Sequence, residues 1–242
     1  MNKIAIFSDV HANLEALQAV LKDMESQGVD MHLFLGDVVG YGANPVECLD
    51  LIGNLECPMI LGNHDAEVAG DHRLDNHRET VRLALEYSRG QLSREQRQFL
   101  AKLPLVGQMN DFILVHASLH EPEKWNYVDT MAETMAHFKE QKLVGCFHGH
   151  THIPMVCELR TSHLTIYRDP KHVLTSSGQW LVNVGSVGQP RDKDPRACYV
   201  IYRPEQNTVE FRRVPYDIAL AQRKIRKAGL PEFLATRLEQ GR

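Results

Sequence analysis

Five short polar fragments of this 242-residue chain each follow a short apolar run, and this arrangement strongly constrains the fold. The fragments are Asp9-Val10-His11, Gly36-Asp37, Gly62-Asn63-His64-Asp65, Val115-His116 and His148-Gly149-His150-Thr151-His152. The preceding runs, such as 3–7, 31–35 and 59–61, are typical of buried strands. In α/β proteins, ligands bind beyond the carboxyl ends of the strands. We therefore expect these side chains, distant in sequence, to meet at one edge of a sheet.

The segments between the strands predict helices. Asn13 is placed to cap a helix that ends before Gly28, and Pro45 is placed to begin a second one. Residues 66–103 are polar with a helical pattern, and they predict a cap-like insertion over the site. Residues 217–228 predict a final amphipathic helix. No linker or change of composition marks a second domain, so residues 1–242 are expected to form one domain.

Composition excludes several classes of protein. The net charge of −4 gives no overall basic field, so no stable nucleic-acid partner is expected. No apolar run approaches the roughly 20 residues that span a membrane, so no membrane association is expected. The five cysteines include no Cys-x-x-Cys pair, which favours reduced thiols in a cytoplasmic protein. The sequence leaves a homo-oligomer open.

The donor atoms of the five fragments are carboxylate oxygens, an amide oxygen and imidazole nitrogens. This set suits divalent ions such as manganese, iron, zinc or nickel, and it argues against a structural zinc site. In an extended Asp-x-His, residues i and i+2 point to the same side, so Asp9 and His11 are expected to reach one ion. The same holds for His150 and His152. The glycines before Asp37, Asn63 and His150 are expected to permit close backbone approach.

The ordered motifs closely resemble those of the calcineurin-like metallophosphoesterase superfamily, which are Asp-x-His, Gly-Asp, Gly-Asn-His-[Asp/Glu], His and Gly-His-x-His. The resemblance covers about residues 1–215. It implies an α/β fold, a four-layer α/β/β/α sandwich of two mixed sheets flanked by helices. It also implies two divalent metal ions, manganese being the first expectation and iron, zinc or nickel the alternatives.

The resemblance also implies a role for each motif residue. The first metal would be held by Asp9, His11, Asp37 and His152. The second would be held by Asp37, Asn63, His116 and His150, with Asp37 bridging. His64 resembles the superfamily's non-ligand histidine, placed to protonate the leaving oxygen or to stabilise the transition state, and Asp65 would orient His64 by a carboxylate–imidazole hydrogen bond. Arg191, in a loop rich in glycine and bounded by proline, is a candidate phosphate clamp because a guanidinium matches two phosphate oxygens.

A narrower likeness concerns two loops. Residues 36–42 (Gly-Asp-Val-Val-Gly-Tyr-Gly) and 183–191 (Asn-Val-Gly-Ser-Val-Gly-Gln-Pro-Arg) look like the small prokaryotic branch described as YfcE-like or diadenosine tetraphosphatase-related. Ala12 and Ala117 stand where that branch usually has glycine, and Val184 stands where proline is common. None of the three is a ligand, so these departures are expected to affect loop shape.

The expected activity is hydrolysis of phosphodiester or phosphomonoester bonds in small molecules or nucleotides, by attack of a hydroxide that bridges two metals. Two alternatives stay open. A serine/threonine protein phosphatase would show Gly-Asp-x-x-Asp-Arg-Gly and Gly-Asn-His-Glu, from which residues 36–42 and 62–65 depart. A non-catalytic scaffold of the same fold would lack ligands and the catalytic histidine, whereas this chain has them all.

Overall fold

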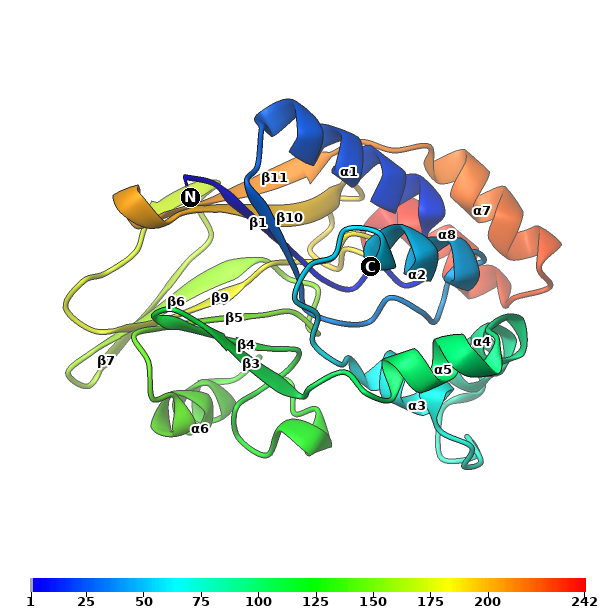
Figure 1. The fold of residues 1–242 in the computed structure, drawn as a ribbon, viewed down its shortest axis with the longest axis horizontal. Coiled ribbons are helices and arrows are strands. Elements are labelled where there is room, and N and C mark those ends of the chain that lie inside the picture. The colour runs from blue at the N-terminus through cyan, green and yellow to red at the C-terminus, as the bar shows by residue number, and fades with distance from the viewer. Residues whose placement is uncertain (1) are drawn as a thin grey trace.

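Two β-sheets pack face to face in a computed structural model that describes residues 2–242 (Figure 1). The first sheet has the order β2 (Met31–Phe34), β1 (Ile4–Phe7), β10 (Ala197–Arg203), β11 (Thr208–Val214) and β8 (Lys171–Val173). The second has the order β3 (Val106–Met109), β4 (Phe112–Val115), β5 (Gly145–His148), β9 (Gln179–Asn183), β6 (Met155–Arg160) and β7 (His163–Tyr167). Both sheets are mixed, because β1–β2, β4–β5 and β5–β9 are parallel while the other neighbours are antiparallel.

The helices lie on the outer faces and at one end of the sheets. They are α1 (Leu14–Gln27), α2 (Pro45–Gly53), α3 (Asn63–Ala69), α4 (Glu79–Gln91), α5 (Arg94–Leu100), α6 (Met131–Glu140), α7 (Ile218–Lys227) and α8 (Glu232–Gln240). The caps of α1 are those expected: Asn13 Oδ1 accepts from the Ala16 N–H at 3.2 Å, and Gly28 ends the helix with a left-handed φ of 61°. The sequence did not predict α6 or α8, and α8 begins after Pro231 without a side-chain cap.

Alternation along β1 builds two of the hydrophobic layers. Ile4 and Ile6 point between the sheets, into a cluster that includes Trp180. Ala5 and Phe7 point the other way, into the cluster beneath α1. Burial of each large side chain contributes about 1.5–3 kcal/mol. Figure 1 shows α6 on the outer face of the second sheet, and a third hydrophobic cluster packs α6 against that face. The four-layer sandwich that the sequence predicted is therefore confirmed.

Residues 59–61 were expected to form a strand, and this prediction is wrong. Met59 makes only a single bridge to Phe34. The Phe34 N–H donates to Pro58 and the Ile60 N–H donates to Phe34, but Leu61 turns away and donates to Pro104. The pairing therefore ends before a strand can form. It still brings the following residues, which begin α3, next to the end of β2.

The predicted helical insertion at 66–103 contains most of α3 and all of α4 and α5. These helices lie at the end of the sandwich to which the site belongs (Figure 1). Its role as a cap over the site stays a prediction. Within residues 2–242, the helices are all too short or too polar to cross a membrane.

Candidate metal centre

The carboxyl ends of two parallel strand pairs, β1–β2 and β4–β5, carry the predicted ligands to one place. Three groups of donor atoms in the described chain lie close enough together to bind an ion, and every residue in them is buried. The groups are Asp9, His11 and His152; His11, Asp37 and His64; and Asp37, His116 and His150. The first and third match the core of the two expected ligand sets, and the middle group connects them.

The first group contains two imidazoles whose nitrogens face each other. His11 Nε2 and His152 Nε2 are 3.1 Å apart. Each ring uses Nδ1 to donate to a backbone carbonyl, His11 to Val39 at 3.0 Å and His152 to Gln189 at 2.6 Å. In the neutral rings both Nε2 atoms therefore carry lone pairs. Asp9 Oδ1 lies 3.2 Å from His152 Nε2, so the pocket between them fits a cation.

The third group is continuous with the first through Asp37. Its Oδ2 lies 3.4 Å from His116 Nε2 and 3.6 Å from His11 Nε2, which places one oxygen between the two groups. Asn63 Oδ1 is 3.2 Å from His116 Nε2. His150 Nε2 and the Oδ1 of Asp9 are buried without a hydrogen-bond partner among residues 2–242. Unpartnered buried donor atoms of this kind fit the divalent ions that the motifs imply.

The pKa shifts of most of these groups favour the protonation states that bind a cation. Burial opposes ionisation of Asp9 and Asp37, but nearby histidines outweigh it, and the pKa of each carboxyl is lowered. Burial lowers the pKa of His150 to about 3, which keeps that ring neutral. Burial also acts to lower the pKa of His116, but the charges of Asp37 and Asp9 and the hydrogen bonds to Asp37 and Leu35 together outweigh it and raise this pKa to about 9. A metal must therefore displace a proton from His116 near neutral pH, which makes its binding pH-dependent.

Several ligand residues adopt the left-handed backbone conformation, so the prediction of an extended backbone at these positions is wrong. Asp9 and His11 have φ of 55° and 48°, and His150 and His152 have φ of 66° and 62°. Such conformations cost about 1–3 kcal/mol each in non-glycine residues and cluster at functional sites. Here the costs are offset by loop hydrogen bonds, such as that from the Asp9 N–H to Gly36 at 2.9 Å. The side chains still converge, but through curled loops instead of extended strand ends.

Two glycines allow these loops to touch, as the sequence predicted. A Cβ on Gly62 would lie 2.2 Å from the backbone nitrogen of Asp37, and one on Gly149 would lie 2.4 Å from Asp9 Oδ2. Ala12 has φ of 52°, in the region that favours glycine, which gives a physical reason for glycine at this position in the resembling branch. The departure at Ala12 thus adds strain to the loop without removing a ligand.

Asp65 does not orient His64, contrary to expectation. Its carboxylate accepts from the backbone N–H of Asp37 at 2.8 Å and of Val38 at 2.9 Å. Asp65 is the third residue of α3, and this position turns its side chain back toward the loop after β2. Burial and the charge of Asp37 raise the pKa of Asp65 to about 7, although the N–H donors oppose this shift. Asp65 therefore positions the loop that presents Asp37.

We expect Asp65→Asn to weaken metal binding about 10- to 100-fold, the usual effect of removing a group that orients a ligand. The amide would place an NH₂ group against backbone donors and leave at least one of them unpaired, at a cost of about 1–3 kcal/mol. Titration of the metal-free protein with Mn²⁺ would measure the loss. Asp111→Asn, at an exposed position, is the matched control. An unchanged affinity in Asp65→Asn would contradict this role.

His64 and Arg191 lie beside the ligands. The His64 ring is 4.8 Å from the His11 ring, and its backbone N–H donates to Asp37 Oδ1 at 2.8 Å. Burial and the charge of Arg191 lower the pKa of His64 to about 4, against the attraction of Asp37. Arg191 Nη2 donates to Gln189 Oε1 at 2.9 Å, while its Nε is buried without a partner in the described chain.

Three neighbours were missed by sequence reasoning. The Tyr41 ring lies 4.5 Å from the His64 ring, and Tyr127 stacks on His150 at 4.1 Å. The Arg237 guanidinium carbon is 6.0 Å from the Tyr41 ring centre. Only Tyr41 had a detectable signal, because it stands between two glycines directly after the Gly-Asp motif. Tyr127 and Arg237 stand in no motif.

The fold and this cluster of ligands define a metallophosphoesterase. The sequence profile described as "Calcineurin-like phosphoesterase superfamily domain" matches residues 2–207, so the chain belongs to this superfamily. It is a metal-dependent phosphoesterase, and the family that the motifs predicted is confirmed.

Full-length relatives support this assignment. The uncharacterized protein MJ0912 of Methanocaldococcus jannaschii is 40% identical over 99% of this chain and 98% of its own. The crystal structure of a metallophosphoesterase from Sphaerobacter thermophilus is 40% identical, covers 100% of this chain and 99% of that one, and has a TM-score of 0.87. The structure of the hypothetical protein PH1004 from Pyrococcus horikoshii OT3 is 20% identical, covers 100% and 99%, and has a TM-score of 0.82, which shows the shared fold.

Proposed function

We propose that this protein is a cytoplasmic hydrolase that uses two divalent ions to cleave phosphodiester or phosphomonoester bonds of small molecules or nucleotides. The observation that carries the proposal is the position of Asp37, whose Oδ2 lies within 3.6 Å of His11 and 3.4 Å of His116. A carboxylate shared between two donor groups is the arrangement that a two-metal site needs. Manganese is the first expectation, because carboxylate and amide oxygens accompany the imidazoles.

Seven residues would hold the two ions. Asp9, His11, Asp37 and His152 would form one set, and Asp37, Asn63, His116 and His150 the other. When bound, the ions would supply a nucleophile derived from water and charge neutralisation at the phosphoryl oxygens. Burial of the ligands supports this role, because charges interact more strongly where water is excluded.

The protein's own groups complete the chemistry. His64 is held by its backbone N–H on Asp37 Oδ1, so its ring has a fixed position beside the ligands. With its pKa lowered to about 4, the ring is neutral at pH 7 and donates an N–H to the leaving oxygen. Arg191 has an unpaired Nε at the same place, and it would bind a non-bridging oxygen of the phosphoryl group.

A substrate panel tests the proposal. The metal-free protein, the Mn²⁺-loaded protein and the loaded protein after chelation would each be assayed on bis-p-nitrophenyl phosphate, p-nitrophenyl phosphate, a dinucleoside polyphosphate and a phosphopeptide. We expect Mn²⁺-dependent hydrolysis of a small-molecule substrate that chelation abolishes. Hydrolysis of the phosphopeptide alone would favour a protein phosphatase. Inactivity on all four, with no metal bound, would favour a scaffold.

A further inference from the structure

Two half-buried arginines near the metal centre lack an acidic side-chain partner in the described chain. Other arginines in the last quarter of the sequence are paired, since Arg212 contacts Asp23 at 3.0 Å and Arg226 contacts Glu232 at 2.6 Å. Within residues 2–242, no Asp or Glu side chain forms an ion pair with Arg191 or Arg237, and Arg237 Nε donates to the backbone oxygen of Arg242. The two guanidinium groups are therefore available to a bound anion.

Both arginines converge on one aromatic ring. The guanidinium carbon of Arg191 is 5.9 Å from the centre of the Tyr41 ring, and that of Arg237 is 6.0 Å. The Tyr41 ring also lies 4.6 Å from the His11 ring, so it is next to the metal centre. The backbone N–H of Arg191 donates to the carbonyl of His152 at 3.3 Å, so Arg191 adjoins the metal ligands.

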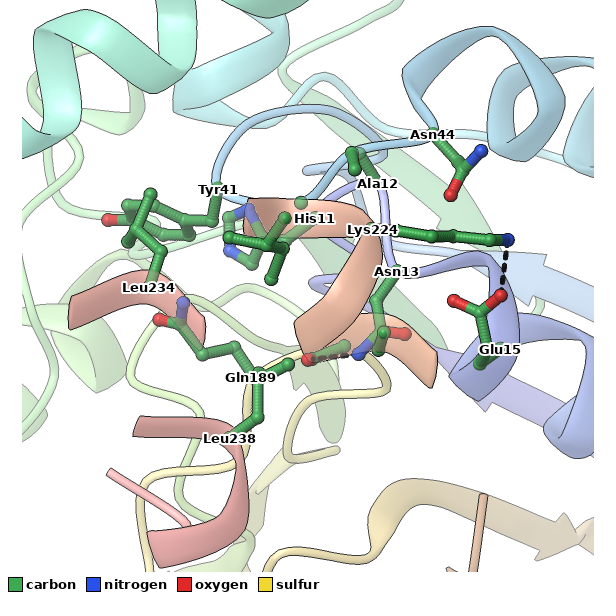
Figure 2. Close-up of a pocket in the computed structure, with 15 residues that line it drawn as sticks. His11, Ala12, Asn13, Glu15, Tyr41, Asn44, Gln189, Lys224, Leu234 and Leu238 are labelled. Atoms are coloured by element: carbon green, nitrogen blue, oxygen red, sulfur yellow. Dashed lines mark hydrogen bonds and ion pairs between the residues drawn. The ribbon is translucent and has the colours of Figure 1, made fainter. Parts of the chain in front are cut away.

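Packing fixes the place of Arg237. It projects from α8, whose Leu234 and Leu238 are buried and line a small cavity shared with His11 and Tyr41, as Figure 2 shows. The end of α8 is tied to the loop that carries Arg191, because the Lys193 N–H donates to the Gly241 carbonyl at 2.9 Å. This contact between α8 and the loop therefore fixes the position of Arg237 relative to Arg191.

Placing two guanidinium groups together costs energy unless an anion lies between them. Burial and the charge of Arg191 lower the pKa of Arg237 to about 10, so Arg237 is still charged at neutral pH. The unpaired Nε of Arg191 is the donor proposed above for the cleaved phosphoryl group, while Arg237 uses its Nε on the Arg242 backbone oxygen and leaves its two terminal nitrogens for another acceptor. Guanidinium donors in this arrangement match phosphate oxygens, with which they form paired, charge-assisted hydrogen bonds.

We propose that the terminal nitrogens of Arg237, beside the Tyr41 ring, form an anion subsite that binds a second, uncleaved phosphate group of the substrate, next to the group that Arg191 contacts. This inference rests on the proposed function, because it assumes that the cleaved phosphate lies on the metals. Arg237 lies beyond residue 207, where the superfamily match ends, so it belongs to a part of the chain that the motifs do not cover. It would select substrates with two phosphate groups over those with one.

A matched pair of substrates tests the selection. The p-nitrophenyl ester of thymidine 5′-phosphate and its 3′-phosphorylated counterpart both release p-nitrophenol, and they differ only in the second phosphate. We expect Arg237→Gln to lower the preference for the 3′-phosphorylated substrate, as a ratio of kcat/KM, about tenfold, mainly through KM. Arg237→Lys should restore part of it, because a point charge remains without the planar fork. Arg223→Gln, at an exposed position of α7, is the control that should leave both substrates unaffected.

A binding measurement separates this proposal from the proposed function. Calorimetric titration of the metal-free protein with inorganic pyrophosphate needs no turnover. A parallel titration with inorganic phosphate tests whether the protein binds two linked phosphate groups more tightly than a single one. We expect pyrophosphate to bind the wild type about tenfold more tightly than Arg237→Gln, with an advantage that shrinks as salt is added. Equal affinity in the two proteins, or an equal loss on both thymidine substrates, would overturn the subsite. If the wild type hydrolyses nothing but binds pyrophosphate through Arg237, the proposed function fails, while anion binding at Arg237 stands without its role in substrate selection.

Discussion

Replacing Asp37 with alanine is expected to remove both metals and to lower phosphoester hydrolysis by roughly 10³-fold or more, the equivalent of several kcal/mol. Asp37 Oδ2 lies 3.6 Å from His11 and 3.4 Å from His116, which is closer to the second donor group than Asp9 Oδ1, at 3.9 Å from His116. The other oxygen of Asp37 accepts the backbone N–H of His64 at 2.8 Å, so the substitution also releases the start of α3. Elemental analysis of the purified protein and steady-state rates with Mn²⁺ measure the two effects.

Asp37→Asn separates the effect of the negative charge of Asp37 from the effect of its side-chain shape. The amide keeps the size of the side chain and a carbonyl oxygen for the His64 N–H, but it loses the negative charge that two cations would share. We expect metal content and rate to fall nearly as far as in Asp37→Ala, while the thermal unfolding of the metal-free protein changes less. Asp111→Asn, on the surface, serves as control. Two bound metals and wild-type turnover in Asp37→Asn would contradict the bridging role.

The ligands were predictable because each follows a short apolar strand. Asp9 follows β1 and His116 follows β4, and parallel neighbours carry such residues to the same edge. The way in which they converge was not predictable. An extended backbone would also have pointed the ligand pairs to one side. Instead, His11 and His150 have left-handed φ values, because tertiary hydrogen bonds override the local backbone preference.

The partners of the site were harder to predict than its ligands. The family resemblance implied that Asp65 orients His64, yet the direction of α3 aims its carboxylate at the backbone N–H groups of residues 37–39. Arg237 had no motif, and it reaches Tyr41 only because α8 folds back onto the loop around Arg191. Contacts of this kind depend on packing between segments that are distant in sequence, 28 residues apart for Asp37 and Asp65 and 196 for Tyr41 and Arg237, which no local pattern encodes.

His64→Ala is expected to keep both metals and lose about 10²- to 10⁴-fold in kcat, because a positioned proton or hydrogen-bond donor contributes that much. His64 lies next to His11 but is not required for either of the two expected ligand sets. Metal content by elemental analysis and kcat on the best substrate of the panel measure the effect, with exposed His163→Ala as control. A His64→Ala protein with wild-type turnover would remove His64 from the mechanism.

The pH profile distinguishes two forms of His64. Burial and the charge of Arg191 lower its pKa to about 4, and nearby cations would favour the neutral ring further. If an imidazolium were required, the rate would fall about tenfold per pH unit above that pKa, and almost no activity would remain at pH 8. If the neutral ring donates its N–H, His64 imposes no fall between pH 5 and pH 8. We therefore expect His64→Ala to lower the rate by a similar factor across that range, and His64→Gln to recover part of it through its amide N–H. A loss in His64→Ala that grows tenfold per unit toward low pH would instead identify the imidazolium as the active form.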